Sequence, residues 1–282
     1  MRNISAAVLL CSFAAVSQAQ VAVLTPTKDN TIIRDLNNAS VARSNALGIQ
    51  TFAGRTAFNA AYVQRTLYKF DIAGAVPAGA TVTDVTLTLQ MTLSGGATTA
   101  PLKLHRLLAD WGEGTSSAFG GSGAPSTTGD ASWAYRFFPT VLWAAAGGDF
   151  VSTPTTALTT TIGSGTVVLP TSSTFVDDVQ AIVDGAEADF GWMLRNDETT
   201  LGSARAFSSR EEPSVAARPT LRISFTPPCP SDINRDRSVD FGDFLAFFNC
   251  FDQELPCGDI DENPGVDFGD FLAFFNGYDA GC

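Results

Sequence analysis

The chain has 282 residues, a formal net charge of −12 and 45% hydrophobic residues. A chain of this length can bury a substantial core and holds one large domain or two smaller ones. No basic stripe is present to neutralise phosphates, which argues against a nucleic-acid partner.

Residues 1–19 have the pattern of a secretory signal peptide. Arg2 supplies a positive charge, residues 4–16 form an apolar run, and small residues precede a cleavage position after Ala19. The alternative is an uncleaved N-terminal anchor. We expect cleavage, and therefore a protein that is secreted and extracellular or at the cell surface. No later stretch is long and apolar enough for a membrane span.

Residues 20–225 have the texture of an all-β domain. Residues 82–92 alternate apolar and polar side chains, as in a strand with one buried face. Further strands are predicted at 64–70, 101–107, 166–170, 190–195 and 219–225. One helix is predicted where Phe175, Val179 and Ile182 share a face, ending near Gly185. Many short strands without alternating helices favour a mainly β fold, a β-sandwich or jelly roll.

An ordered set of short motifs extends through the same region. The set comprises DNTI at 29–32, LYKFDI at 67–72, VPAGA at 76–80, WGEG at 111–114, GDASW at 129–133, Trp143, GGDF at 147–150, FGWML at 190–194, FSSRE at 207–211 and RP at 218–219. By these motifs the region resembles DNRLRE-type modules, a group related to family 96 carbohydrate-binding modules. The resemblance implies a jelly-roll-like β-sandwich and binding of extracellular polysaccharide.

Sugar binding needs aromatic faces with flanking polar groups, and binding residues often lie on loops of rigid sandwiches. The Gly/Ser/Thr-rich segment 110–149 supplies both kinds of residue. The candidate ligand-binding residues are Trp111, Glu113, Trp133, Tyr135 and Trp143. The alternative is that these aromatic side chains fill the core or tie the long segment down.

Signals for catalysis are few. The single histidine, His105, lies inside a predicted strand, and no nucleophile, zinc or phosphate-loop motif is present. A carboxylate pair for glycoside chemistry is the remaining option, from Glu113, Asp130, Asp149 or 211–212. We expect a non-catalytic protein that binds polysaccharide or matrix. The alternatives are a secreted polysaccharide-degrading enzyme, either hydrolase or lyase, and a structural cell-surface protein.

A Pro-rich join at 226–230 leads into a C-terminal region, 229–282, of different composition. This region contains 12 acidic residues and two arginines, and it contains every cysteine except Cys11. Such a shift in charge and cysteine content marks a domain boundary. Four cysteines in a small exported module indicate two disulfides, with three connectivities open.

The C-terminal region contains an internal repeat, because the segment VDFGDFLAFFN at 239–249 recurs unchanged at 266–276. Each copy follows an acidic loop, with oxygen side chains at positions 1, 3, 5, 9 and 12 and a backbone carbonyl available at position 7. This is the spacing of a calcium-binding loop. The predicted calcium ligands are Asp232, Asn234, Asp236, Ser238, Asp240 and Asp243 in loop 1, and Asp259, Asp261, Asn263, Gly265, Asp267 and Asp270 in loop 2.

Helical spacing follows each loop. Phe241, Phe244, Leu245 and Phe248 share one stripe, as do Phe268, Phe271, Leu272 and Phe275 in the second copy. We expect these two faces to pack on each other. Phe247 and Phe274 lie off the stripe, where they are either exposed or part of the core.

Two such loop–helix repeats, at 232–249 and 259–276, resemble a type I dockerin. The resemblance covers 229–282 and implies calcium as cofactor and a cohesin-like or other protein partner. It also brings the two ends together, which implies disulfides Cys229–Cys282 and Cys250–Cys257. Position 6, normally glycine, is Arg237 in loop 1 and Pro264 in loop 2, so we expect Gly265 to adopt the unusual backbone angle there. Recognition positions 10 and 11 are Phe-Gly in both repeats, which argues against an ordinary cohesin.

Overall fold

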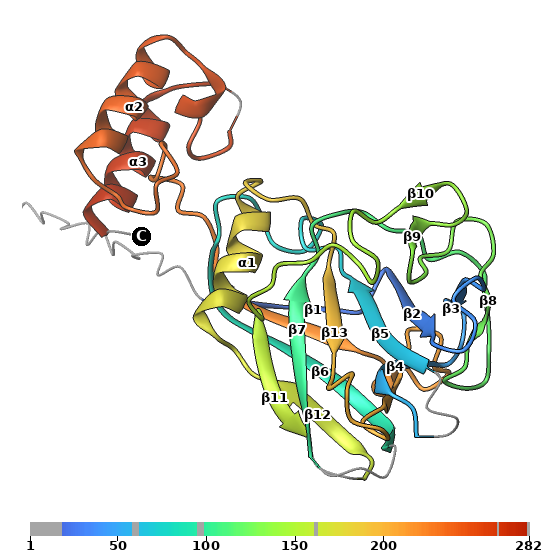
Figure 1. The fold of residues 1–282 in the computed structure, drawn as a ribbon. Helices are drawn as coiled ribbons and strands as arrows, with labels where there is room; N and C mark the ends of the chain where they lie inside the picture. Colours follow the sequence, from blue (N-terminus) through green and yellow to red (C-terminus); the bar gives the residue numbers. More distant parts are fainter. Residues whose placement is uncertain (1–18, 58–61, 95–98, 161–162, 264, 281–282) are drawn as a thin grey trace, which may run out of the picture. The chain divides into compact units, whose positions relative to one another are not determined.

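The computed structural model of the chain describes residues 19–57, 62–94, 99–160, 163–263 and 265–280. The chain divides into two compact units. The first, here called the β unit, comprises Gln20–Ala78 and Val82–Phe225. The second contains Thr226–Cys282 and is here called the tail. Figure 1 shows that strands dominate the β unit and that two helices dominate the tail. In these ranges no helix has the length and apolar character needed to cross a bilayer. Residues 1–18 of the predicted signal peptide lie outside the described residues.

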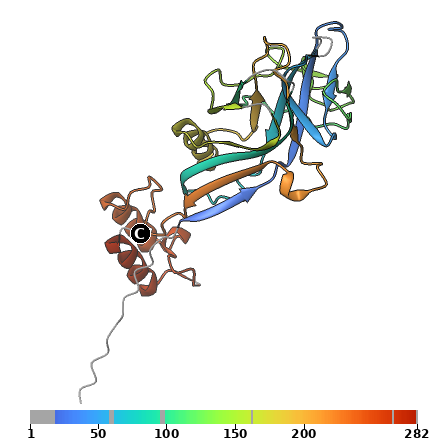
Figure 2. The same ribbon diagram turned by 90° about the horizontal axis from the view of Figure 1, so that it is seen from below.

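A large antiparallel sheet forms the β unit, and its main path runs β1-β15-β6-β14-β4-β5-β13-β7-β11. These strands are β1 Gln20–Leu24, β4 Gln50–Arg55, β5 Tyr62–Lys69, β6 Thr81–Ser94, β7 Ala100–Arg106, β11 Thr156–Thr160, β13 Trp192–Arg195, β14 Arg205–Ser208 and β15 Thr220–Thr226. Figure 2 shows β1, β15 and β6 as long neighbours in blue, orange and teal.

The remaining described strands lie off this path. β2 (Lys28–Asp35) pairs with β5 and with β3 (Arg43–Asn45), β8 (Ala124–Pro125) pairs with β3, and β12 (Gly165–Leu169) pairs with β6. β9 (Tyr135–Phe137) and β10 (Val141–Leu142) form a separate small hairpin. The fold is therefore mainly β, as the many short strands without alternating helices predicted, and the large sheet is antiparallel.

All the strands predicted from alternation are present, with ends shifted by about two residues at most. The predicted helix is also present as α1 (Ser173–Val183), and its start has a clear cause. The Ser172 hydroxyl accepts a hydrogen bond from the Phe175 backbone N–H at 3.0 Å, which caps the first turn. Phe175, Val179, Ile182 and Val183 are buried. Gly185 follows with φ 70°, a conformation that glycine adopts readily.

Segment 110–149 is held against the sheet by a hydrophobic core. Trp111 and Trp143 pack with Ile32, Leu67 and Met193 in one buried cluster. Both indole N–H groups are satisfied, since Trp111 donates to the Phe190 carbonyl and Trp143 to the Ser132 carbonyl, each at 2.9 Å. Large aromatic side chains with a satisfied polar group contribute strongly to burial, so these two residues fix a segment that has little regular structure.

The tail contains α2 (Phe241–Asp252), a 3₁₀ turn η3 (Pro256–Gly258) and α3 (Phe268–Ala280). Phe247 and Phe274 are fully buried and stack with 4.2 Å between ring centroids. The prediction that the stripe of Phe241, Leu245 and Phe248 packs in the core was wrong, because these side chains are 64%, 54% and 50% exposed. Phe268 and Leu272, at 67% and 49% exposed, correct the prediction in the same way for the second helix.

The buried face of α2 contains the carboxylate of Asp243, which belongs to the site of loop 1. Asp243 is fully buried because it points back into loop 1, and Phe247 lies four residues later on the same helix face. Phe244 still contributes partly, since its ring meets Phe275 edge-on with centroids 5.9 Å apart. Asp243 and Phe247 therefore share the buried face of α2.

The predicted disulfide Cys250–Cys257 is present and joins α2 to the 3₁₀ turn, with 5.5 Å between the two Cα atoms. Cys282 lies outside the described residues, so the Cys229–Cys282 bond stays a prediction.

Candidate functional site

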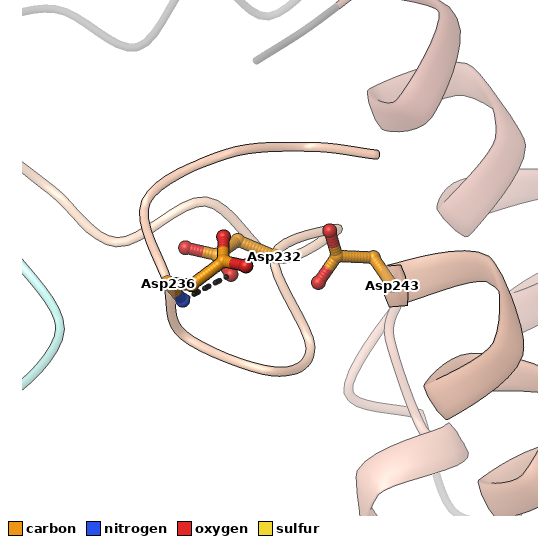
Figure 3. Close-up of side chains that lie close together, drawn as sticks. All are labelled: Asp232, Asp236 and Asp243. Carbon is orange, nitrogen blue, oxygen red and sulfur yellow. Dashed lines mark hydrogen bonds between the residues drawn. The ribbon is translucent and has the colours of Figure 1, made fainter. Parts of the chain in front are cut away.

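Loop 1 brings three predicted ligands together in front of α2. Asp232, Asp236 and Asp243 each offer a carboxylate oxygen, and these oxygens lie within 4.8 Å of one another. Figure 3 shows Asp243 projecting from the first turn of the helix toward Asp232 and Asp236 on the loop. The helix start thus supplies one fixed carboxylate, and the loop supplies two.

Backbone N–H groups hold these carboxylates in place. Asp232 accepts hydrogen bonds from the backbone N–H of Asp236 at 3.1 Å and of Arg237 at 2.9 Å. Asp243 accepts from the N–H of Asn234 at 3.0 Å and of Asp240 at 2.9 Å. The tight winding requires Arg237 to adopt φ 71°, a conformation that costs a residue with a Cβ about 1 kcal/mol.

Loop 2 repeats the arrangement with Asp259, Asp261 and Asp270, again within 4.8 Å of one another. Asp270 is fully buried and accepts hydrogen bonds from the N–H groups of Ile260 at 2.7 Å and Asp267 at 2.8 Å. Asp259 differs, because its Oδ1 atom is buried and has no hydrogen-bond partner. An orphaned carboxylate oxygen facing two further carboxylates is a ready ligand for a cation.

The electrostatics of loop 2 fit the same interpretation. Burial, followed by the charges of Asp270 and Asp261, raises the pKa of Asp259. Burial alone would raise the pKa of Asp270 too, but the N–H groups of Asp267, Asp261 and Ile260 hold that pKa below its usual value. Asp270 is therefore kept as a carboxylate while its neighbour is crowded by negative charge. Carboxylates in such an arrangement fit a hard cation such as Ca²⁺.

Two predicted ligands have another role in this structure. The Asp240 and Asp267 side chains accept hydrogen bonds from the N–H groups of Gly242 at 2.7 Å and Gly269 at 2.6 Å, which caps the two helices. A β-carbon at Gly269 would lie 2.7 Å from Asp261 Oδ2, so this glycine lets the helix start approach the ligand. Gly242 and Gly269 are thus site residues that spacing alone did not indicate.

The other predicted ligands lie beside the carboxylate triads. The Asn234 side-chain amide is 3.0 Å from Asp236 Oδ2, and the Ser238 N–H donates to Asp236 Oδ1 at 2.9 Å. The Asn263 N–H donates to Asp261 Oδ1 at 3.1 Å. Gly265 has φ 107°, the unusual angle expected of it, and Pro264 lies outside the described residues.

The structure separates the aromatic candidates of the β unit. Trp111 is fully buried and Trp143 is 5% exposed, so neither has a face open to a sugar ring. The Arg65 guanidinium lies 4.4 Å from the ring centroid of half-buried Trp133. Tyr135, also half-buried, packs edge-on against Phe138. For Trp111 and Trp143 the structure thus matches the alternative interpretation, that these residues fill the core.

The most exposed aromatic side chain of segment 110–149 is that of Phe119, which was not among the predicted binding residues. Phe119 is 91% exposed, next to Gly120 and Gly121. Its position in a glycine-rich stretch was the available signal, since binding residues concentrate on such loops.

The carboxylates considered for glycoside chemistry are engaged in structural contacts. Asp130 is buried and accepts from the Ser44 hydroxyl at 2.9 Å, and Asp149 accepts from the backbone N–H of Ala145 at 2.8 Å. Glu113 forms an ion pair with Arg210 at 2.7 Å. His105 is nearly buried, and burial lowers its pKa.

No model of a known protein family matches the chain, and no curated protein matches it.

Proposed function

We propose that the chain is a secreted, non-catalytic protein with two roles divided between its units. The β unit, a jelly-roll-like β-sandwich, binds extracellular polysaccharide or another matrix or cell-surface component. The tail is a calcium-dependent, dockerin-like module that attaches the protein to a cohesin-like or other protein partner. The observation that carries the proposal is the duplicated carboxylate triad, closed in each copy by a buried aspartate from a helix.

Calcium suits these loops because it takes six to eight oxygen ligands in flexible geometry. In loop 1, Asp232, Asp236 and Asp243 would hold it, with Asn234 and the Ser238 carbonyl beside them. The ion would supply positive charge to a cluster of carboxylates and fix the loop against the helix. The orphaned Asp259 oxygen supports the same role for loop 2.

Exposed apolar side chains on both tail helices support the attachment role. Phe241, Leu245 and Phe248 lie along one face of α2, and Phe268 and Leu272 occupy the equivalent positions on α3. Contiguous patches of exposed large apolar side chains often mark surfaces that bind another molecule. The first nine residues of the two helices are identical, so the exposed pair Phe241 and Leu245 recurs as Phe268 and Leu272, whereas Phe275, the counterpart of Phe248, is half-buried.

The calcium claim is tested on the full chain by equilibrium dialysis. Asp243→Asn combined with Asp270→Asn removes the buried carboxylate of each triad, and we expect calcium binding to fall by two ions per chain. The matched control is Asp252→Asn, an exposed carboxylate at the end of α2, which should leave binding unchanged. Unchanged binding in the double variant would disprove the loop assignment.

The polysaccharide claim is tested by affinity electrophoresis on a panel of neutral and acidic polysaccharides. We expect retardation without product release, and weaker retardation for Phe119→Ala. Leu142→Ala, a 60% exposed apolar residue of the same segment, is the control. Release of reducing ends or unsaturated products would establish the degrading enzyme instead. Binding only to a cell-wall fraction would point to the structural protein.

A further inference from the structure

Three acidic residues of the β unit, Asp29, Glu113 and Glu211, form a cluster around Arg210 that has no role in the proposed function. Asp29 lies on β2 and is fully buried. Its Oδ2 atom accepts a hydrogen bond from the Arg210 backbone N–H at 2.7 Å, whereas its Oδ1 atom is buried with no hydrogen-bond partner. The Oε2 atom of Glu211 is likewise buried without a partner.

One guanidinium pairs with two of the three carboxylates of the cluster, those of Glu113 and Glu211. Arg210 Nε lies 2.7 Å from Glu113 Oε1 and 2.9 Å from Glu211 Oε1. Glu113 Oε1 also accepts from the Asp29 backbone N–H at 2.8 Å. Three carboxylates around a single arginine leave an excess of two negative charges. A buried charge without a partner costs several kcal/mol, so a further positive group beside fully buried Asp29 would stabilise the folded protein.

The neighbouring cationic side chains are engaged elsewhere. The Lys28 ammonium pairs with Asp110 at 2.9 Å and lies over the Trp111 ring. The Arg218 side chain donates to the Glu212 carbonyl at 2.8 Å. A single proton would neutralise only one of the two surplus charges, whereas a divalent cation would neutralise both.

We propose that Asp29 Oδ1 and Glu211 Oε2 are ligands of a calcium ion bound within the β unit, separate from the tail loops. Carboxylate oxygens are the ligands that calcium prefers, and its flexible coordination suits a site between a strand and an irregular segment. The Glu211 side chain is 18% exposed although its Oε2 atom is buried, and water molecules would complete the coordination. Glu113 and Arg210 act as positioning residues, because they hold Glu211 and the Asp29 backbone in place.

The position of this site gives it a structural role. Asp29 belongs to β2, and Glu211 follows β14, and these two strands do not pair with each other. An ion between them would join two parts of the sheet that share no hydrogen-bond ladder. The inference does not depend on the proposed function of either unit.

The test uses the full chain carrying Asp243→Asn and Asp270→Asn, so that the tail loops do not contribute. Terbium is the probe, read through emission sensitised by tryptophan and displaced by calcium, with equilibrium dialysis for stoichiometry. All four tryptophans lie in the β unit, so sensitised emission selects a site there. We expect one calcium ion per chain, and a chain that binds none would overturn the proposal.

Two substitutions then locate the ion. Asp29→Asn and Glu211→Gln should each weaken calcium binding more than about tenfold, since even residues outside the coordination sphere contribute that much to metal affinity. Glu212→Gln is the matched control at the adjacent position and should bind as the parent does. Should Asp29→Asn fail to fold, the more exposed Glu211→Gln decides alone. A folded variant that binds calcium as tightly as the parent would refute the assignment.

Discussion

Glu198 links two arginines of neighbouring strands. It accepts from Arg65 Nε at 2.7 Å and from Arg195 Nε at 2.9 Å, and the Arg65 side chain is only 9% exposed. Burial alone would raise the pKa of Glu198, but the hydrogen bonds and charges of the two arginines outweigh it and hold this pKa below its usual value. The carboxylate is thus more stable in the folded than in the unfolded protein.

We predict that Glu198→Gln destabilises the protein by about 3 kcal/mol at neutral pH, because it leaves the buried Arg65 charge unpaired. A carboxyl group with a lowered folded-state pKa stabilises the fold above its unfolded pKa, about 4.3 for glutamate, and this stabilisation disappears as pH falls through the folded-state pKa. Urea unfolding over a pH series should therefore show the difference between variant and wild type shrinking in acid.

The control for this prediction is Glu187→Gln. Glu187 pairs with Arg106 at 3.0 Å but its side chain is 47% exposed, so the loss should stay below about 1 kcal/mol. A destabilisation by Glu198→Gln that is the same at every pH would show that lost packing, not lost charge, is its cause.

At the level of the helices, Phe247 stacks on Phe274 at the centre of the tail, while its neighbour Phe248 is half exposed, so the two residues can be compared directly. We predict that Phe247→Ala destabilises the tail by about 3–5 kcal/mol, because it removes a fully buried ring and leaves a cavity beside Phe274. Phe248→Ala, next along the same helix and 50% exposed, should change stability by about 0.5 kcal/mol or less. Thermal unfolding followed at a helix wavelength measures both, and the reverse order would contradict the packing described above.

The same helices show what sequence could and could not predict. Their existence and starts followed from spacing, but phenylalanine occupies so many positions that periodicity selected the wrong buried face. In the β unit, alternation found β6, whereas β2 was missed because its sequence, KDNTIIRD, is polar although Asp29, Asn30 and Thr31 are buried. The pattern that identifies a strand assumes that polar residues face water.

The candidate sites divide in the same way. The tail ligands lie within one short loop and its helix, so their spacing was enough to predict that Asp232, Asp236 and Asp243 meet. The contact between Asp29 and Arg210 joins residues 181 positions apart, and no local pattern reports on it. The burial of Trp111 also depends on partners from distant strands, which is why composition suggested a binding residue there.

For the whole molecule, the division into two units predicts two thermal transitions. Calcium at about 100 times its dissociation constant should stabilise the unit that binds it by about 2.7 kcal/mol. We expect it to raise both transitions in the wild type, only the β-unit transition in Asp243→Asn/Asp270→Asn, and only the tail transition in Asp29→Asn. Scanning calorimetry separates these outcomes. A single transition that shifts as one in all variants would show that the two units unfold together.

The helix caps of the tail affect how loss of the proposed calcium ions would be detected. Asp240 caps α2, and Asp243 bonds back to the Asp240 N–H, through contacts that are complete within the protein itself. We therefore expect the helices to keep their first turns when calcium is chelated, with almost no change in far-ultraviolet circular dichroism at room temperature. An assay that scores secondary structure alone would report the chelated tail as intact, so resistance to heat or protease is the more sensitive readout of the proposed metal.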